Sequence, residues 1–255
     1  MALSFPHYQD IRLGNPPLVE VICQVRIPPI LKIQTAAPSD FQDKIRDRFP
    51  SLSIEQGMIL SIAAGGTNPP APNMQPRAYK FTADDGKSTA ALSVDFFAVS
   101  TTAYIHWADF VRDLMLVYDA VAAVYKPIHA TRIGLRYVNR LTPANTGHGN
   151  IEQALAMLRP QLTAQLHADV WNEPSDAFTQ LILADGNGKL ALRTAYGHDT
   201  DANTPFFVLD FDYFEEGKIG LADLVKRCDQ YHQKTYDAFR WCFVDESMSA
   251  FSPLE

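Results

Sequence analysis

Three arginines spaced four residues apart are the first candidates for chemistry in this sequence. Arg132, Arg136 and Arg140 lie in residues 132–141, where apolar side chains alternate with polar ones. This period of two predicts a β-strand that carries all three guanidinium groups on the face opposite its apolar side chains. Such a row is suited to hold a carboxylate, a phosphate or an acidic peptide.

Two other stretches with strand periodicity place charges on the equivalent face. One carries Asp210 and Asp212, and the other carries Glu20 and Arg26. The arginines could pair with these carboxylates on a solvated sheet, each pair contributing roughly 0.2–1 kcal/mol. Alternatively, the charged face could bind an anionic ligand. Both interpretations stay open, because the sequence does not define the strand register.

Two aromatic residues on the same polar face suggest an interface. Phe206 and Phe214 lie at the two ends of a predicted strand and are expected to be exposed. Together with the proline-rich loop at 65–76, they could form a contact surface with a protein partner or within a homodimer.

A histidine in a predicted helix is the main catalytic candidate. Asp229 precedes His232 by three positions and Tyr236 follows it by four, so all three share one helix face. A carboxylate that orients an imidazole is the arrangement of a general base. However, no nucleophile is nearby, and the common zinc-protease, hydrolase and phosphate-loop motifs are absent. The sequence therefore predicts no catalytic residue, metal site or cofactor, and a hydrolase remains a third hypothesis.

The elements that must position these residues repeat along the chain. Residues 18–125 and 132–243 both show the order strand, helix, hairpin strands and long helix, with starts offset by roughly 100–115 residues. The long amphipathic helices are predicted at 107–125 and 221–243. The pattern predicts one α+β domain over residues 1–255, with two pseudo-repeated halves forming antiparallel sheet and the long helices on one face. The opposite, polar face is expected to be free.

The shorter elements follow from the same periodicities and from proline and glycine positions. The predicted strands are 19–27, 58–63, 78–83, 88–99, 178–184, 189–196 and 206–214, and the predicted short helices are 39–49 and 151–162.

Composition narrows the class of protein. The net charge of −7 argues against nucleic acid as the general partner. Three cysteines cannot form a disulfide framework. No apolar run is long enough to cross a membrane, and the first residues lack the pattern of a secretion signal. We therefore expect a cytoplasmic protein without membrane contact.

Four stretches resemble a sporadically distributed bacterial family of uncharacterised proteins of similar length. They are Asn15–Ile27 (NPPLVEVICQVRI), Tyr79–Gly86 (YKFTADDG), Tyr104–Phe110 (YIHWADF) and Arg132–Arg140 (RIGLRYVNR). The family has no established activity, so the resemblance implies no catalytic residue. Its scattered occurrence implies horizontally moved accessory genes and suggests a role in defence against phage.

The sequence favours a non-catalytic binding or regulatory accessory module. It would hold a small anionic ligand, or an acidic segment of a protein partner, on the polar sheet face that carries the arginine row. The alternative from a different class is an assembly protein that acts through a protein–protein interface.

Overall fold

Two strands with alternating apolar residues form the centre of the fold. β1 (Leu18–Arg26) and β6 (Ala130–Leu141) pair antiparallel, with Val21 opposite Tyr137 and Cys23 opposite Leu135. The computed structural model describes residues 3–56, 77–166, 170–171, 174–200 and 203–254.

Seven further strands extend this pair into a nine-stranded antiparallel sheet with the order β2-β3-β4-β5-β1-β6-β9-β8-β7. They are β2 (Ser51–Gln56), β3 (Arg77–Thr82), β4 (Ser88–Ser93), β5 (Phe96–Thr101), β7 (Ala177–Asp185), β8 (Gly188–His198) and β9 (Pro205–Ile219). Outward from β1 come the strands of the first half of the chain, and outward from β6 come those of the second half.

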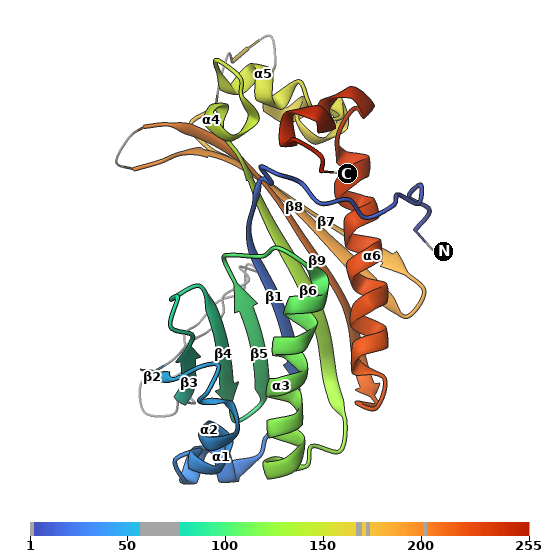
Figure 1. The fold of residues 1–255 in the computed structure, drawn as a ribbon. Helices are drawn as coiled ribbons and strands as arrows, with labels where there is room; N and C mark the ends of the chain where they lie inside the picture. The colour runs from blue at the N-terminus through green and yellow to red at the C-terminus, as the bar shows by residue number, and fades with distance from the viewer. Residues whose placement is uncertain (1–2, 57–76, 167–169, 172–173, 201–202, 255) are drawn as a thin grey trace.

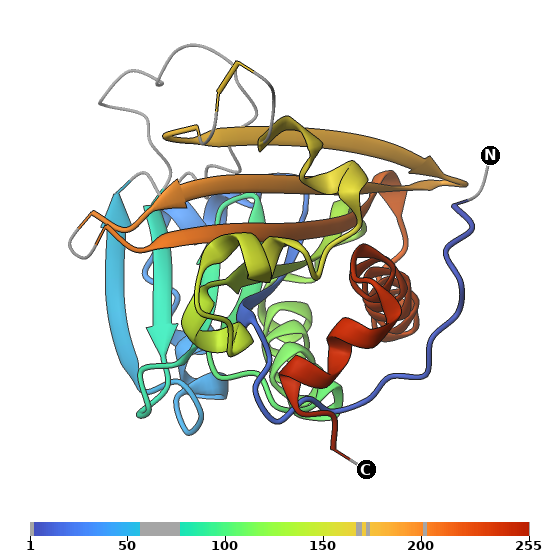
Figure 2. The same ribbon diagram turned by 90° about the horizontal axis from the view of Figure 1, so that it is seen from above.

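Two long helices cover one face of the sheet (Figure 1). α3 (Trp107–Tyr125) follows β5, and α6 (Leu224–Cys242) follows β9. Figure 2 shows the sheet curving around both helices. The shorter helices are α1 (Leu31–Thr35), α2 (Ser39–Ile45), α4 (Pro143–Thr146) and α5 (Ile151–Leu155), with 3-10 turns at Pro160–Leu162, Ala164–Leu166 and Asp245–Phe251.

The core lies between the sheet and the long helices. Its buried apolar side chains form one cluster that draws on both halves of the chain, including Leu135 from β6, Val117 from α3 and Tyr231 from α6. Full burial of each such side chain contributes about 1.5–3 kcal/mol. Among the described residues, no helix is long and apolar enough to span a membrane.

The predicted α+β class, the antiparallel sheet and the two long helices are confirmed, and the helix at 107–125 has the predicted bounds. Three details were wrong. The strand predicted at 88–99 is a hairpin of β4 and β5, the helix predicted at 39–49 ends at Ile45, and the helix predicted at 151–162 ends at Leu155. β2 and α1 were not predicted. The strand at 58–63 and the loop at 65–76 lie outside the described residues.

Candidate functional site

The predicted arginine row is paired with carboxylates across the sheet. Arg132 Nη2 donates to both carboxylate oxygens of Asp212 at 2.9 Å, and Arg136 donates to both oxygens of Asp210 at 2.7 and 2.8 Å. Arg193 of β8, which the sequence did not single out, lies 3.2 Å from Asp210 and 3.7 Å from Asp212. The two aspartates are only 4% and 2% exposed. Three guanidinium groups therefore share two buried carboxylates.

The remaining arginine and the two aromatic residues complete this arrangement. Arg140 pairs with Asp199 at 2.5 Å, and its guanidinium lies 4.3 Å from the centre of the Phe206 ring. Arg132 covers Phe214 in the same way at 4.5 Å. Both phenylalanines are half-buried. The expectation that they are exposed was wrong, because arginine side chains lie flat on aromatic faces.

The predicted site residues on β1 contribute less to this network. Burial raises the pKa of Glu20, against the opposing attraction of Arg136 and Lys80. Arg26 is exposed, and its Nε donates to Gln24 Oε1 at 3.3 Å. Ligand binding at this face stays a prediction. The three arginines of the row are engaged by acidic side chains, which leaves an incoming anion to compete with those partners.

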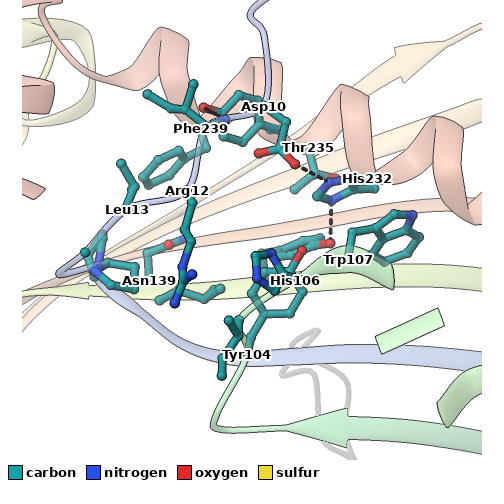
Figure 3. Close-up of a pocket in the computed structure, with 18 residues that line it drawn as sticks. Asp10, Arg12, Leu13, Tyr104, His106, Trp107, Asn139, His232, Thr235 and Phe239 are labelled. Atoms are coloured by element: carbon teal, nitrogen blue, oxygen red, sulfur yellow. Dashed lines mark hydrogen bonds and ion pairs between the residues drawn. The ribbon is translucent and has the colours of Figure 1, made fainter. Parts of the chain in front are cut away.

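A cavity of about 550 Å³ lies on the opposite face of the sheet, between α3 and α6 (Figure 3). Four segments line it: residues 10–18 near the N-terminus, residues 104–107 at the start of α3, β6, and α6. From α6 come His232, Thr235, Tyr236 and Phe239, whose spacing of three and four residues places them on one side of the helix. From β6 come Tyr137 and Asn139, two residues apart and therefore on one face of the strand.

His232 is held by three side chains at the side of this cavity. Its Nδ1 lies 2.7 Å from the hydroxyl of Tyr137, and its Nε2 lies 3.1 Å from Asp10 Oδ2. The ring stacks on Trp107 with 4.5 Å between centroids and 5° between planes. When the imidazole is neutral, the Tyr137 hydroxyl donates to Nδ1, and Nε2–H donates to Asp10. These contacts fix the ring in one orientation.

The predicted pairing of His232 with Asp229 was wrong. Asp229 instead accepts a hydrogen bond from Trp107 Nε1 at 2.7 Å, so it holds the indole on which the imidazole stacks. The carboxylate that contacts His232 is Asp10, 222 residues earlier in the chain. No sequence signal pointed to Asp10, because it lies in an irregular segment without helix or strand periodicity.

Two tyrosines form the polar floor of the cavity. The rings of Tyr104 and Tyr137 pack edge to face, with 6.0 Å between their centroids. Burial raises the pKa of both phenols, with a smaller contribution to Tyr104 from the charge of Asp10. Both hydroxyls therefore stay protonated near neutral pH and act as hydrogen-bond donors rather than as bases.

Two polar side chains of the cavity have no partner within the described part of the chain. Thr235 is 2% exposed, and its hydroxyl makes no hydrogen bond there. Arg12 lines the cavity, and its guanidinium forms no ion pair or hydrogen bond with any described residue. Figure 3 shows the Arg12 side chain directed into the cavity. The exposed guanidinium of Arg12 is therefore available to a ligand, whereas the Thr235 hydroxyl is buried.

The lining is poor in groups for covalent chemistry. None of the described residues around the cavity is a cysteine, serine or lysine. In the described ranges, no cluster of three or more histidine, cysteine or acidic residues is placed to hold a metal ion. The arrangement is suited to binding, with aromatic walls, hydrogen-bonding groups, the cation of Arg12, and the carboxylate of Asp10, which is paired with His232.

Comparisons with known proteins do not show which family the chain belongs to. No model of a protein family matches it, and no curated protein matches its sequence. Weak similarity extends to the solved structures of major latex-like protein 151 from Panax ginseng (9% identity, 89% of this chain and 99% of that chain, TM-score 0.15). It also extends to DynU16, a putative protein in the dynemicin biosynthetic locus (9% identity, 91% of this chain and 97% of that chain, TM-score 0.19). A third such structure is the di-domain ARO/CYC StfQ from the steffimycin biosynthetic pathway (11% identity, 91% of this chain and 95% of that chain, TM-score 0.15). TM-scores this low carry no argument about fold or function.

Proposed function

We propose that the protein is a non-catalytic binding module for a small organic anion with an aromatic or otherwise apolar body, held in the cavity between α3 and α6. The observation that carries this proposal is the unpaired guanidinium of Arg12, which points into an aromatic-walled cavity. The proposed ligand is an anion, as expected from the sequence, but its proposed site is on the helical face of the sheet and not at the arginine row.

The size and lining of the cavity support this ligand class. A volume of about 550 Å³ lies within the usual range for small-molecule sites. Trp107, Tyr104 and Phe239 offer ring faces and edges to an apolar body, while Arg12 offers a charged donor to an anionic group. A hydrogen bond to a charged group contributes about 1.5–3 kcal/mol. Because Arg12 is exposed, we expect the lower end of this range.

The segment that carries Arg12 is fixed before any ligand arrives. We call residues 8–14 the N-terminal strap. Its Tyr8 backbone N–H donates to Asp237 at 2.9 Å, its Ile11 N–H donates to the Tyr236 hydroxyl at 3.1 Å, and Asp10 pairs with His232. These contacts with α6 reduce the ordering cost of placing a cation at the cavity, which favours binding.

We further infer that the two halves of the chain are a pseudo-repeat. In support, β1 and β6 are the first strands of their halves and adjoin at the centre of the sheet, and each half ends in a long helix. The cavity draws on β6 and on both long helices, so it lies where the two halves meet. A duplicated fold would thereby provide a site that neither half contains alone.

Two fluorescent probes of similar shape test the proposal. 1-Anilinonaphthalene-8-sulfonate is an aromatic anion, and N-phenyl-1-naphthylamine is its uncharged counterpart. We expect Arg12→Gln to weaken binding of the sulfonate by about tenfold and to leave binding of the neutral probe unchanged. The matched control is Arg112→Gln, an exposed arginine on α3 outside the cavity.

A second variant tests the location. Ile105 is 57% exposed and lines the cavity, so Ile105→Trp adds bulk at the rim without disturbing the core. We expect this substitution to weaken binding of both probes. Equal sulfonate binding by wild type, Arg12→Gln and Ile105→Trp would contradict the proposal.

A further inference from the structure

The outer edge of the sheet at β7 is long, apolar and uncharged. β7 ends the strand order and pairs only with β8 among the described strands. Its sequence, AFTQLILAD, contains no proline and carries no charge before Asp185. The ladder with β8 runs over the whole strand without a bulge. Charged side chains, prolines and bulges normally protect a sheet edge from pairing with another strand, and none of these lies along residues 177–184.

Apolar side chains are exposed on both faces of this strand. Phe178 is 60% exposed and Ile182 is 58% exposed. They share a face with Gln180, whose Oε1 accepts a hydrogen bond from Arg193 of the charged sheet face. Leu181, 47% exposed, is directed to the opposite face. A helix or a flat surface docked on the sheet would cover only one of these faces, whereas an added strand contacts both.

We propose that two copies of this chain form a homodimer by antiparallel pairing of their β7 edges, which joins the two sheets into one. The strand is complementary to itself. A two-fold axis beside Gln180, perpendicular to the sheet, places Phe178 of each copy against Ile182 of the other. Because residues 177–184 are uncharged, pairing two identical strands brings no like charges together along the ladder. A charged partner strand would find no complementary charge along this stretch.

The symmetry of this contact limits the size of the assembly. Each copy uses the same edge, so the contact is isologous and closes at two subunits.

The net charge of −7 on each chain opposes association at long range, and salt screens this repulsion. We therefore expect the dimer to become more stable as ionic strength rises, in contrast to a dimer held by ion pairs.

Sedimentation velocity of the purified full chain over a range of micromolar concentrations tests the proposal. We expect a dimer for wild type and a dissociation constant at least tenfold higher for both Ile182→Lys and Leu181→Lys. The matched control is Ile128→Lys, at an 88% exposed position outside the strands, which is expected to remain dimeric. Because all three positions are exposed, the variants should keep the secondary structure of wild type, which circular dichroism checks.

Three outcomes would overturn the inference. The first is a wild-type monomer at every concentration and salt level. The second is dissociation by Ile182→Lys but not by Leu181→Lys, which would place a partner on one face instead of along the strand edge. The third is assembly beyond two subunits. Amide hydrogen exchange offers an independent measurement, since pairing should increase protection in β7 as the protein concentration rises.

Discussion

Removal of Arg136 separates a structural arginine row from a ligand-binding one. Arg136 makes two hydrogen bonds to Asp210, which is 4% exposed, and only Arg193 would remain to compensate this carboxylate. Leaving a buried charge without a partner costs about 3–5 kcal/mol. Because Arg193 keeps one contact with Asp210 at 3.2 Å, we expect Arg136→Ala to lower the free energy of unfolding by about 2–4 kcal/mol.

Urea unfolding followed by circular dichroism measures this loss. Arg112→Ala is the control, since Arg112 is 71% exposed and pairs with Asp109 on the helix surface. Its expected cost is below about 0.5 kcal/mol. We also expect Arg136→Ala, at temperatures where it is folded, to bind the anilinonaphthalene sulfonate as wild type does, because Arg136 does not line the cavity.

A double substitution examines the same reasoning from the other side. Arg136→Met combined with Asp210→Leu removes both members of the pair. Arg193 then keeps its hydrogen bond to Gln180 Oε1 at 2.8 Å and its ion pair with Asp212 at 3.7 Å. We expect the double variant to be more stable than Arg136→Ala alone, because no unpaired carboxylate stays buried. The account would be refuted by an Arg136→Ala protein within about 1 kcal/mol of wild type that has lost anion binding. That result would make the row a ligand site.

Two further predictions concern the packing of single residues. Burial raises the pKa of Asp185, but hydrogen bonds from Lys234, Tyr213 and a backbone N–H lower it more, so the net shift is downward. A carboxyl group whose pKa is lower in the folded state stabilises the fold at pH values above its unfolded pKa, and this stabilisation is lost in acid. Asp185→Asn should therefore lower the free energy of unfolding by about 1–3 kcal/mol at pH 7, and by less below about pH 4. Urea unfolding at both pH values measures the difference. Gly134→Ala should lower the thermal midpoint, because a Cβ there would lie 2.8 Å from Cζ of Arg132 and displace the arginine from Asp212. An unchanged midpoint would contradict this packing.

The periodic elements of this fold could be predicted because burial imposes a period on the sequence. Ile133 and Leu135 alternate with polar residues since one face of β6 packs on the helices, and both are fully buried. The bounds of α3 followed from its apolar stripe and the proline beyond its end. Hairpins were harder, since the tight turn between β4 and β5 lacks glycine and proline and the two strands look like one.

The cavity could not be predicted, because its key contacts join segments that are distant in the chain. His232 was recognised, but its carboxylate partner lies in the N-terminal strap, 222 residues away. Arg12 carries no local signal, since its role depends on where the strap docks on α6 and on Asp10, which lines the same cavity, pairing with His232 instead. In contrast, the arginine row was conspicuous in the sequence, although the pairing partners Arg193 and Asp199 emerged only from the strand register and loop positions.

A crystal structure of the protein with bound anilinonaphthalene sulfonate tests the central claim most directly. We expect the rings of the probe between α3 and α6, next to Trp107, with its sulfonate within hydrogen-bonding distance of Arg12. A sulfonate bound instead to Arg132 or Arg136 on the opposite face of the sheet would contradict the account and restore the arginine row as the binding site.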